Sequence, residues 1–378
     1  MFRNAPTIII ESDTVYHRIT INKMADWTNL PEGVVTLFAA KIDGPRSDVI
    51  RAFRGVCKPW REDISMAVTK ATMLEGAEAG VQQVLKTTPK LLSMTVAGTA
   101  WATLLTDIRA VKQLVPELTS FVFDLCDLYS CDTPISQCLV ETTTILELRY
   151  CHIKRCTIVN IEYLRSLTSL TLYMTGLESE ETQASICASV FSLMPSLRFI
   201  ELGTCEMRMD NIRSIDLPNL TWLGVNNSTI WHPEFLSGLT HLEHLDLRST
   251  NVAEYAGDLP ADLPSSITSL DLHTEQYCEK HILTEGFFRL ASRLKLLSSL
   301  KLGMDDQVTN GVLRAFGNVE SLTQLSLYDC PRVTDHGLMN LARSRLKLLE
   351  IQYCWRITQE GVDALRAAAP TIDIVFNF

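Results

Sequence analysis

The sequence has no excess of positive charge. It holds 34 lysines and arginines against 44 aspartates and glutamates, which gives a formal net charge of −10. Proteins that bind nucleic acid or anionic membranes usually carry a basic patch, and no Lys/Arg run stands out here. The composition argues against both kinds of partner and favours a protein partner.

Long apolar runs and a leader-peptide pattern are also missing. The stretch Ile8-Ile9-Ile10 falls far below the roughly 18 consecutive apolar residues that a membrane-spanning helix needs. Eleven cysteines without a leader pattern are typical of a reducing compartment. We therefore expect a cytoplasmic or nuclear location, or both, and no insertion into a membrane.

The motifs of common catalytic and cofactor sites do not occur. The chain contains no GxSxG, P-loop or GxGxxG, and none of its eight histidines lies in a recognisable catalytic motif. A metal site could be drawn between residues 126 and 156, but no CxxC pair exists there, and structural zinc sites usually show close ligand pairs. We predict no enzymatic activity, no cofactor and no metal site. The residues considered were Cys126, Cys131, Cys138, Cys151, His152 and Cys156.

What the sequence does contain is a repeated motif, LxxLxLxx, followed by Cys, Thr, Ser or an acidic residue. One such motif cannot bury its leucines alone, but stacked copies form a parallel sheet over a continuous core. Eleven copies begin 22 to 30 residues apart, at Leu91, Leu118, Thr143, Leu167, Leu197, Leu220, Leu242, Ile267, Leu297, Leu322 and Leu346.

The motif and its spacing resemble the leucine-rich repeat, whose period is about 20–29 residues. The predicted fold class is an α/β leucine-rich-repeat solenoid, a horseshoe with a parallel concave sheet and a convex side of mixed helical and irregular segments. Helices are expected within residues 285–297 and 334–342, whereas Pro233 argues against a helix there. Residues 372–376 are expected to form a capping strand.

The C-terminal repeats resemble the cysteine-containing leucine-rich-repeat subfamily. Cys330 and Cys354 each precede a Thr-x-x-Gly segment, at residues 334–337 and 358–361. The resemblance implies that the cysteine is buried at the corner after the strand and that the threonine caps the next helix. Five cysteines share this ninth position and are expected to be buried, unmetallated thiols: Cys126, Cys151, Cys205, Cys330 and Cys354.

Residues 26–66 resemble an F-box. The opening Leu30-Pro31 pair, the apolar spacing up to Ile42 and the closing Val56-Cys57-x-x-Trp60-Arg61 run carry the resemblance. It implies an α-helical module that docks on the Skp-type linker subunit of a cullin-RING (SCF-type) ubiquitin ligase. About three extra residues within 43–47 depart from the usual spacing, in a turn where length is tolerated. The alternative is a cap that only shields the first repeat. The predicted linker-binding residues are Leu30, Pro31, Val34, Phe38, Ile42 and Trp60.

The predicted organisation has three parts. Residues 1–25 form a strand-like extension, 26–66 the F-box-like module, and 67–378 the solenoid with about 11 repeats and a C-terminal capping strand. Within the extension, residues 7–11 and 15–21 alternate around Ser12-Asp13, which predicts a hairpin.

The concave face is the predicted binding surface. In each LxxLxLxx copy the leucines at positions 1, 4 and 6 point inward, so positions 3, 5, 7 and 8 face outward. Aromatic rings beside charges at these positions indicate a protein-binding surface, and the acids favour a partner with a basic segment. The alternative is that the chain's own C-terminal tail or loops cover the rings. The predicted residues are Tyr150, Tyr173, Phe199, Glu201, Trp222, His244, Asp246 and Asp271.

These features support one main functional hypothesis and two rivals. The main hypothesis is a substrate adaptor that brings a protein target to a ubiquitin ligase. A second is a non-catalytic scaffold of a cytoskeletal or chromosomal assembly with a degenerate F-box cap. A third, without a distinguishing motif, is an inhibitor or GTPase-regulating solenoid.

Overall fold

The computed structural model describes the repeats and a short N-terminal segment. The described residues are 7–12, 15–20, 70–73, 91–97, 115–126, 139, 141–151, 164–173, 194–203, 217–227, 229–230, 233–252, 263–273, 286–303 and 308–377. The F-box-like module at 26–66, with its six predicted linker-binding residues, lies outside them.

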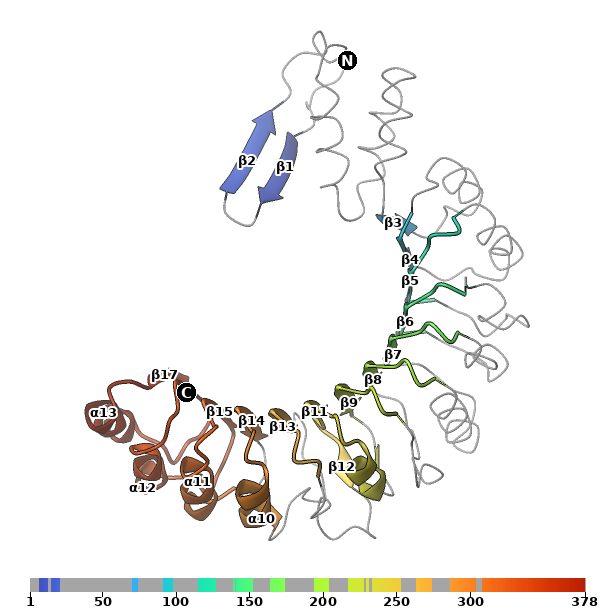
Figure 1. Cartoon of the computed structure of the whole chain (residues 1–378). Helices are drawn as coiled ribbons and strands as arrows, with labels where there is room; N and C mark the ends of the chain where they lie inside the picture. The colour runs from blue at the N-terminus through green and yellow to red at the C-terminus, as the bar shows by residue number, and fades with distance from the viewer. Residues whose placement is uncertain are drawn as a thin grey trace.

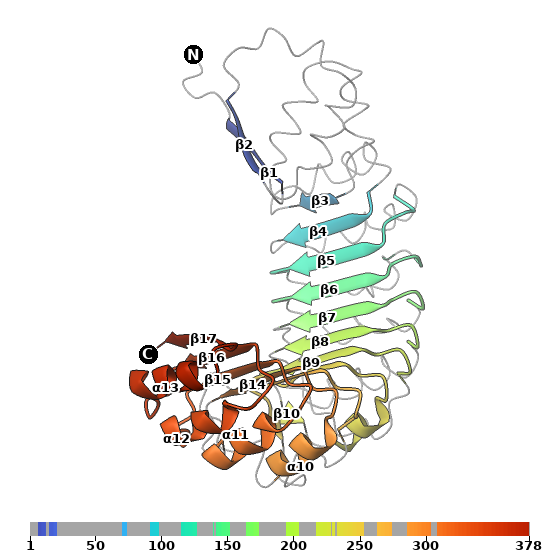
Figure 2. The same cartoon turned by 60° about the vertical axis from the view of Figure 1, so that its left-hand side comes forward.

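A single sheet of 13 parallel strands lines the inner side of a curved solenoid (Figure 1). The strands follow one another in chain order and all point the same way (Figure 2). They are β3 (Lys70–Met73), β4 (Ser93–Ala97), β5 (Ser120–Asp124), β6 (Ile145–Arg149), β7 (Ser169–Tyr173), β8 (Phe199–Gly203), β9 (Trp222–Asn226), β11 (His244–Asp246), β13 (Ser269–His273), β14 (Ser299–Gly303), β15 (Gln324–Tyr328), β16 (Leu348–Gln352) and β17 (Asp373–Asn377).

The register of the sheet aligns the leucines into one core. Leu170 of β7 pairs with Ile200 of β8, and Leu172 pairs with Leu202. All four side chains are buried, as are their equivalents from β5 to β16. Because side chains alternate along a strand, this burial leaves positions 3, 5 and 7 of each repeat on the concave side. The predicted repeat and its parallel sheet are confirmed.

Described helices lie on the outer side of the arc, opposite the sheet (Figure 1). They confirm the helices expected within 285–297 and 334–342, and β17 confirms the capping strand. The described convex elements are β10 (Thr229–Ile230), η4 (Pro233–Gly238), β12 (Asn251–Val252), α10 (Gly286–Arg293), α11 (Asn310–Gly317), α12 (Asp335–Leu338), η5 (Met339–Leu341) and α13 (Gln359–Ala368).

The prediction against a helix at Pro233 was wrong, because the 3₁₀ helix η4 begins at that residue. Proline is tolerated in the first turn, where its missing N–H has no helical acceptor.

The hairpin is confirmed by β1 (Thr7–Ser12) and β2 (Val15–Thr20), which pair antiparallel. The sequence prediction missed β3, which precedes the first copy of the motif.

A left-handed corner ends many of the strands. Among the described residues, each non-glycine residue with a positive φ holds position 8 of its repeat. This conformation turns the chain out of the sheet while its N–H still donates to the next strand. Asp329, for example, donates to the Gln352 carbonyl at 2.9 Å. The residues are Leu125, Tyr150, Asn227, Ser249, Asp329 and Tyr353.

The buried residue at position 9 stabilises the same corner. The Cys151 thiol donates to the Arg149 carbonyl at 3.3 Å and to the Phe123 carbonyl of the preceding repeat at 3.5 Å. Thr250 makes the equivalent bonds to Arg248 and Val225 with its hydroxyl. Cys126, Cys151, Cys330 and Cys354 are buried thiols as predicted, whereas Cys205 lies outside the described residues. These buried thiols satisfy carbonyl groups at the strand ends.

Thr143 is an exception within the core. It holds position 1, where the other copies have leucine or isoleucine, and it is 1% exposed. Within the described part of the chain its hydroxyl has no hydrogen-bond partner. Thr143→Val should raise the free energy of unfolding by about 1 kcal/mol, because it replaces an unsatisfied buried hydroxyl with a methyl group of similar size. Urea denaturation measures the change. Thr143→Ser keeps the hydroxyl and should destabilise the protein, and an unchanged midpoint for Thr143→Val would contradict the argument.

Candidate functional site

Four aromatic side chains lie on the concave face of neighbouring strands β6 to β9. We call Tyr150, Tyr173, Phe199 and Trp222 the aromatic group. Tyr150 and Tyr173 meet edge to face with ring centroids 5.3 Å apart. Phe199 and Trp222 stack at 4.1 Å with an interplanar angle of 14°. Tyr150 is exposed, and the other three are half-buried. The structure thus brings all four predicted aromatic residues onto adjacent repeats.

Two glycines make room for these rings. A Cβ atom added to Gly203 would lie 2.2 Å from Cδ2 of Tyr173, so that ring covers the end of β8. A Cβ atom on Gly224 would lie 2.5 Å from Cη2 of Trp222 and 3.6 Å from Cγ of Glu201. The Trp222 ring therefore lies over its own strand and approaches the Glu201 side chain.

Acid–base pairs recur along the same face, with the acid at position 5 and the base at position 7 of one strand. Glu147 pairs with Arg149 on β6. On β11, Asp246 accepts from Nε of Arg248 at 2.9 and 3.0 Å. These contacts neutralise much of the charge that the acids would otherwise present to a partner.

Asp271 on β13 is the most enclosed of the predicted acids. It contacts Nδ1 of His273 at 2.8 Å and Nζ of Lys301 on β14 at 3.2 Å. Burial pushes the pKa of Asp271 upward, but the hydrogen bond and charge of His273, with the charge of Lys301, lower it below the ordinary value. Asp271 therefore stays ionised, and its charge is balanced by side chains of the same face, His273 and Lys301.

Glu201 differs from the other acids. Within the described residues its carboxylate forms neither a hydrogen bond nor an ion pair, although the side chain is half-buried. Burial raises the pKa of Glu201, and the charge of Asp246 raises it further. His244, the remaining predicted residue, is exposed at the start of β11.

Sequence reasoning missed further aromatic residues at the C-terminal end. Tyr328 on β15 and Tyr353 after β16 meet edge to face at 5.1 Å, and Tyr353 is 53% exposed. They occupy positions 7 and 8 of their repeats, so the column pattern that found Tyr150 and Tyr173 would also have found them. Trp355, two residues after Tyr353, is also exposed, and the guanidinium of Arg356 lies over its ring.

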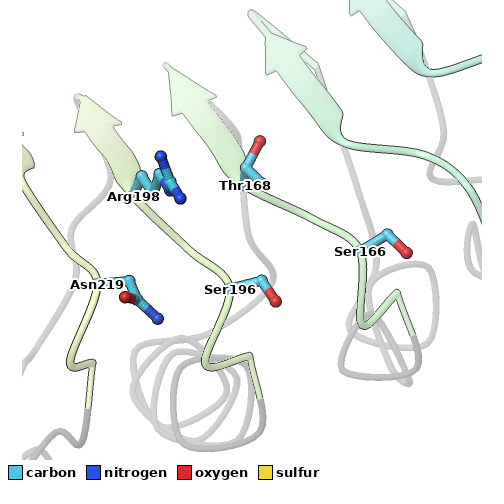
Figure 3. Close-up of a pocket in the computed structure, with 5 residues that line it drawn as sticks. All are labelled: Ser166, Thr168, Ser196, Arg198 and Asn219. Carbon is cyan, nitrogen blue, oxygen red and sulfur yellow. The ribbon is translucent and has the colours of Figure 1, made fainter.

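A polar pocket of about 360 Å³ lies where β7 to β9 begin (Figure 3). Its lining comes from three successive repeats and adjoins the residues that start β8 and β9, Phe199 and Trp222. Asn219 donates to the Pro195 carbonyl at 2.8 Å, which ties two of these repeats together. The lining residues are Ser166, Thr168, Ser196, Arg198 and Asn219.

Neither a metal-binding cluster nor a membrane-spanning helix occurs among the described residues. No group of three or more His, Cys, Asp or Glu side chains there is placed to hold a metal ion. Likewise, no helix in that part of the chain is long and apolar enough to cross a membrane. The C-terminal residues up to 377 form the last strand of the sheet, far along the strand order from Phe199 and Trp222.

The stacked parallel strands and the shared leucine core define a leucine-rich-repeat-type solenoid. No protein-family model and no curated protein matches the sequence. Solved structures do match the fold. An internalin (inlF) from Listeria monocytogenes is similar with a TM-score of 0.54 and 17% identity, over 88% of this chain and 88% of that chain. The yeast Rad7 and Elc1 complex contains a chain with a TM-score of 0.52 and 14% identity, over 91% of this chain and 92% of that chain.

Proposed function

We propose that the chain is a non-catalytic adaptor that holds a target protein on its concave face. The observation that carries this proposal is the aromatic group, whose rings lie beside charged side chains on four adjacent strands. Large rigid rings lose little conformational entropy on binding and desolvate readily, which is why protein-binding hot spots use them. The class of partner is a protein, because the chain is acidic and the face carries both rings and charges.

We further propose that the adaptor is the substrate-recognition subunit of a cullin-RING (SCF-type) ubiquitin ligase. The F-box-like residues 26–66 would bind the Skp-type linker, and the ligase core would supply the catalysis. The support is the order of the two units, an F-box-like module followed by repeats. The fold likeness to the yeast Rad7 and Elc1 complex is compatible with a solenoid that assembles with another protein.

Separate variants of the full-length chain test the two binding functions. Leu30→Asp combined with Pro31→Ala should abolish co-purification of a Skp-type subunit from cells and leave target binding intact. Trp222→Ala should retain the Skp-type subunit and weaken target binding by about tenfold or more, because it removes half of the ring stack. Co-purification with quantitative mass spectrometry measures both losses, and target half-life reports on degradation.

The matched control is Leu296→Ala, since Leu296 is exposed and lies on the turn before β14, away from the concave face. It should change neither set of partners. If the intact chain never retains a Skp-type subunit, the ligase role is wrong. Stoichiometric residence in a large assembly, with no effect on any protein's half-life, would instead support the scaffold.

A further inference from the structure

Five of the described strands carry an acid at position 5, and for three of them a base follows two residues later. The exceptions are β16, where Glu350 instead accepts a hydrogen bond from Oγ of Ser326 at 2.7 Å, and β8. On β6, β11 and β13 the acid is followed two residues later by a base that pairs with it: Arg149, Arg248 and His273. On β8 the acid is Glu201, but position 7 is Gly203. Tyr173 of the preceding strand covers that glycine, so the space of the missing base is taken by a ring. The carboxylate of Glu201 therefore lacks the base that pairs with the acid on β6, β11 and β13.

The neighbours of Glu201 do not supply that base. Its registered neighbours are Thr171 on β7 and Gly224 on β9, neither of which is ionisable. The nearest strands with bases are β6 and β11, where Arg149 and Arg248 are engaged with their own acids. Burial and the charges of Asp246 and Glu147 raise the pKa of Glu201. The more distant charges of Arg248 and Arg149 lower it only in part, so the pKa stays above its ordinary value. A carboxylate in this position is stabilised by a cation from outside the chain.

The surroundings of Glu201 select the kind of cation. Phe199, two residues earlier on the same strand, stacks on Trp222 with one ring face. On its other side the registered neighbour is Ser169, whose short side chain has no ring to stack on Phe199, and Phe199 remains partly exposed. A cation that reaches Glu201 along this side therefore passes over an aromatic face. Attraction between a cation and a ring face adds to the ion pair in such a site.

We propose that Glu201 and the Phe199 ring form a receptor for an arginine side chain of the bound protein, supplied by an extended segment that crosses β7 and β8. The inference rests on the proposed adaptor function and names the chemistry of its target. The guanidinium replaces the base that β8 lacks. Arginine fits better than lysine, because its flat group stacks on a ring while it donates two parallel hydrogen bonds to a carboxylate.

Selection from a display library of random linear peptides tests the proposal. The full-length chain serves as bait, and peptides that also bind the Trp222→Ala variant are removed. The surviving peptides should share an arginine at one position. Replacing that arginine by lysine should weaken binding several-fold, and replacing it by glutamine should weaken binding about tenfold or more. Glu201→Gln in the bait should cause a loss similar to that of the glutamine peptide, and the two changes together should add little.

A charge reversal and a matched control sharpen the result. Glu201→Arg should lose the selected peptides and regain binding to versions in which the shared arginine is replaced by glutamate. Glu243→Gln, an equivalent change at an exposed residue outside the concave positions, should leave all affinities unchanged. Peptides without a common arginine, or equal binding by the Glu201→Gln bait, would overturn the proposal. Such a result would leave the adaptor function standing if Trp222→Ala still loses its cellular target.

Discussion

Leu325→Ala is expected to lower the free energy of unfolding by about 2–5 kcal/mol, the usual cost of removing a buried leucine side chain. Leu325 is 0% exposed and lies in β15, where it pairs in register with Leu300 and Leu349 of the adjacent strands. Its loss leaves a cavity in the core that three repeats share, and neighbouring repeats stabilise one another through that core. Urea denaturation followed by circular dichroism measures the effect.

The matched control for this substitution is Leu296→Ala. Leu296 is 57% exposed, so its truncation should change the stability by about 0.5 kcal/mol or less. Equal losses for the two leucines would mean that Leu325 does not belong to a shared core. The leucine solenoid itself would then be wrong.

Gly361→Ala is expected to cost about 2 kcal/mol, although alanine normally favours a helix. A Cβ atom at this position of α13 would lie 2.1 Å from Oδ1 of Asp335 in the preceding repeat. Asp335 accepts from the backbone N–H of Thr358 at 2.8 Å and from its hydroxyl at 2.9 Å. Thr358 in turn caps α13 by accepting from the Gly361 N–H at 3.2 Å. The added methyl group must displace this whole connection between two repeats.

A second substitution distinguishes the clash from a general effect on the helix. Asp335→Gly removes the side chain that the new methyl group meets, so the double variant should be less destabilised than the sum of the two single variants. Gly238→Ala is the control, since a Cβ atom there meets nothing within 4 Å. It should leave stability unchanged or raise it slightly. Additive losses in the double variant would contradict the packing explanation.

The core could be predicted from the sequence because its signal repeats. Leucines such as Leu170 and Leu245 recur at fixed positions, and both are buried as expected. The strand β3 was missed because Ala71 and Met73, which pair in register with Met94 and Val96 of β4, stand where the motif has leucine. The 3₁₀ helix at Pro233 was missed because a rule for helix interiors was applied to a first turn.

Less of the arrangement on the concave face could be predicted from the sequence. The outward columns could be read from the alternation of a strand, and they located Tyr173 and Trp222 correctly on one face. The pairing of Asp246 with Arg248 had a sequence signal, an acid and a base two residues apart, but it was not used. The position of the Tyr173 ring over Gly203 had none, because it depends on the register between strands and on a side-chain rotamer.

The residues of each strand alternate between two roles: some pack in the core and the others form the concave surface. Leu202 faces the core and Glu201, next to it, faces the concave side. A mutation in the outward column changes the surface of the concave face without opening the interior, and the reverse holds for the inward column. The chemistry of that surface can consequently diverge through successive single changes while the architecture is retained.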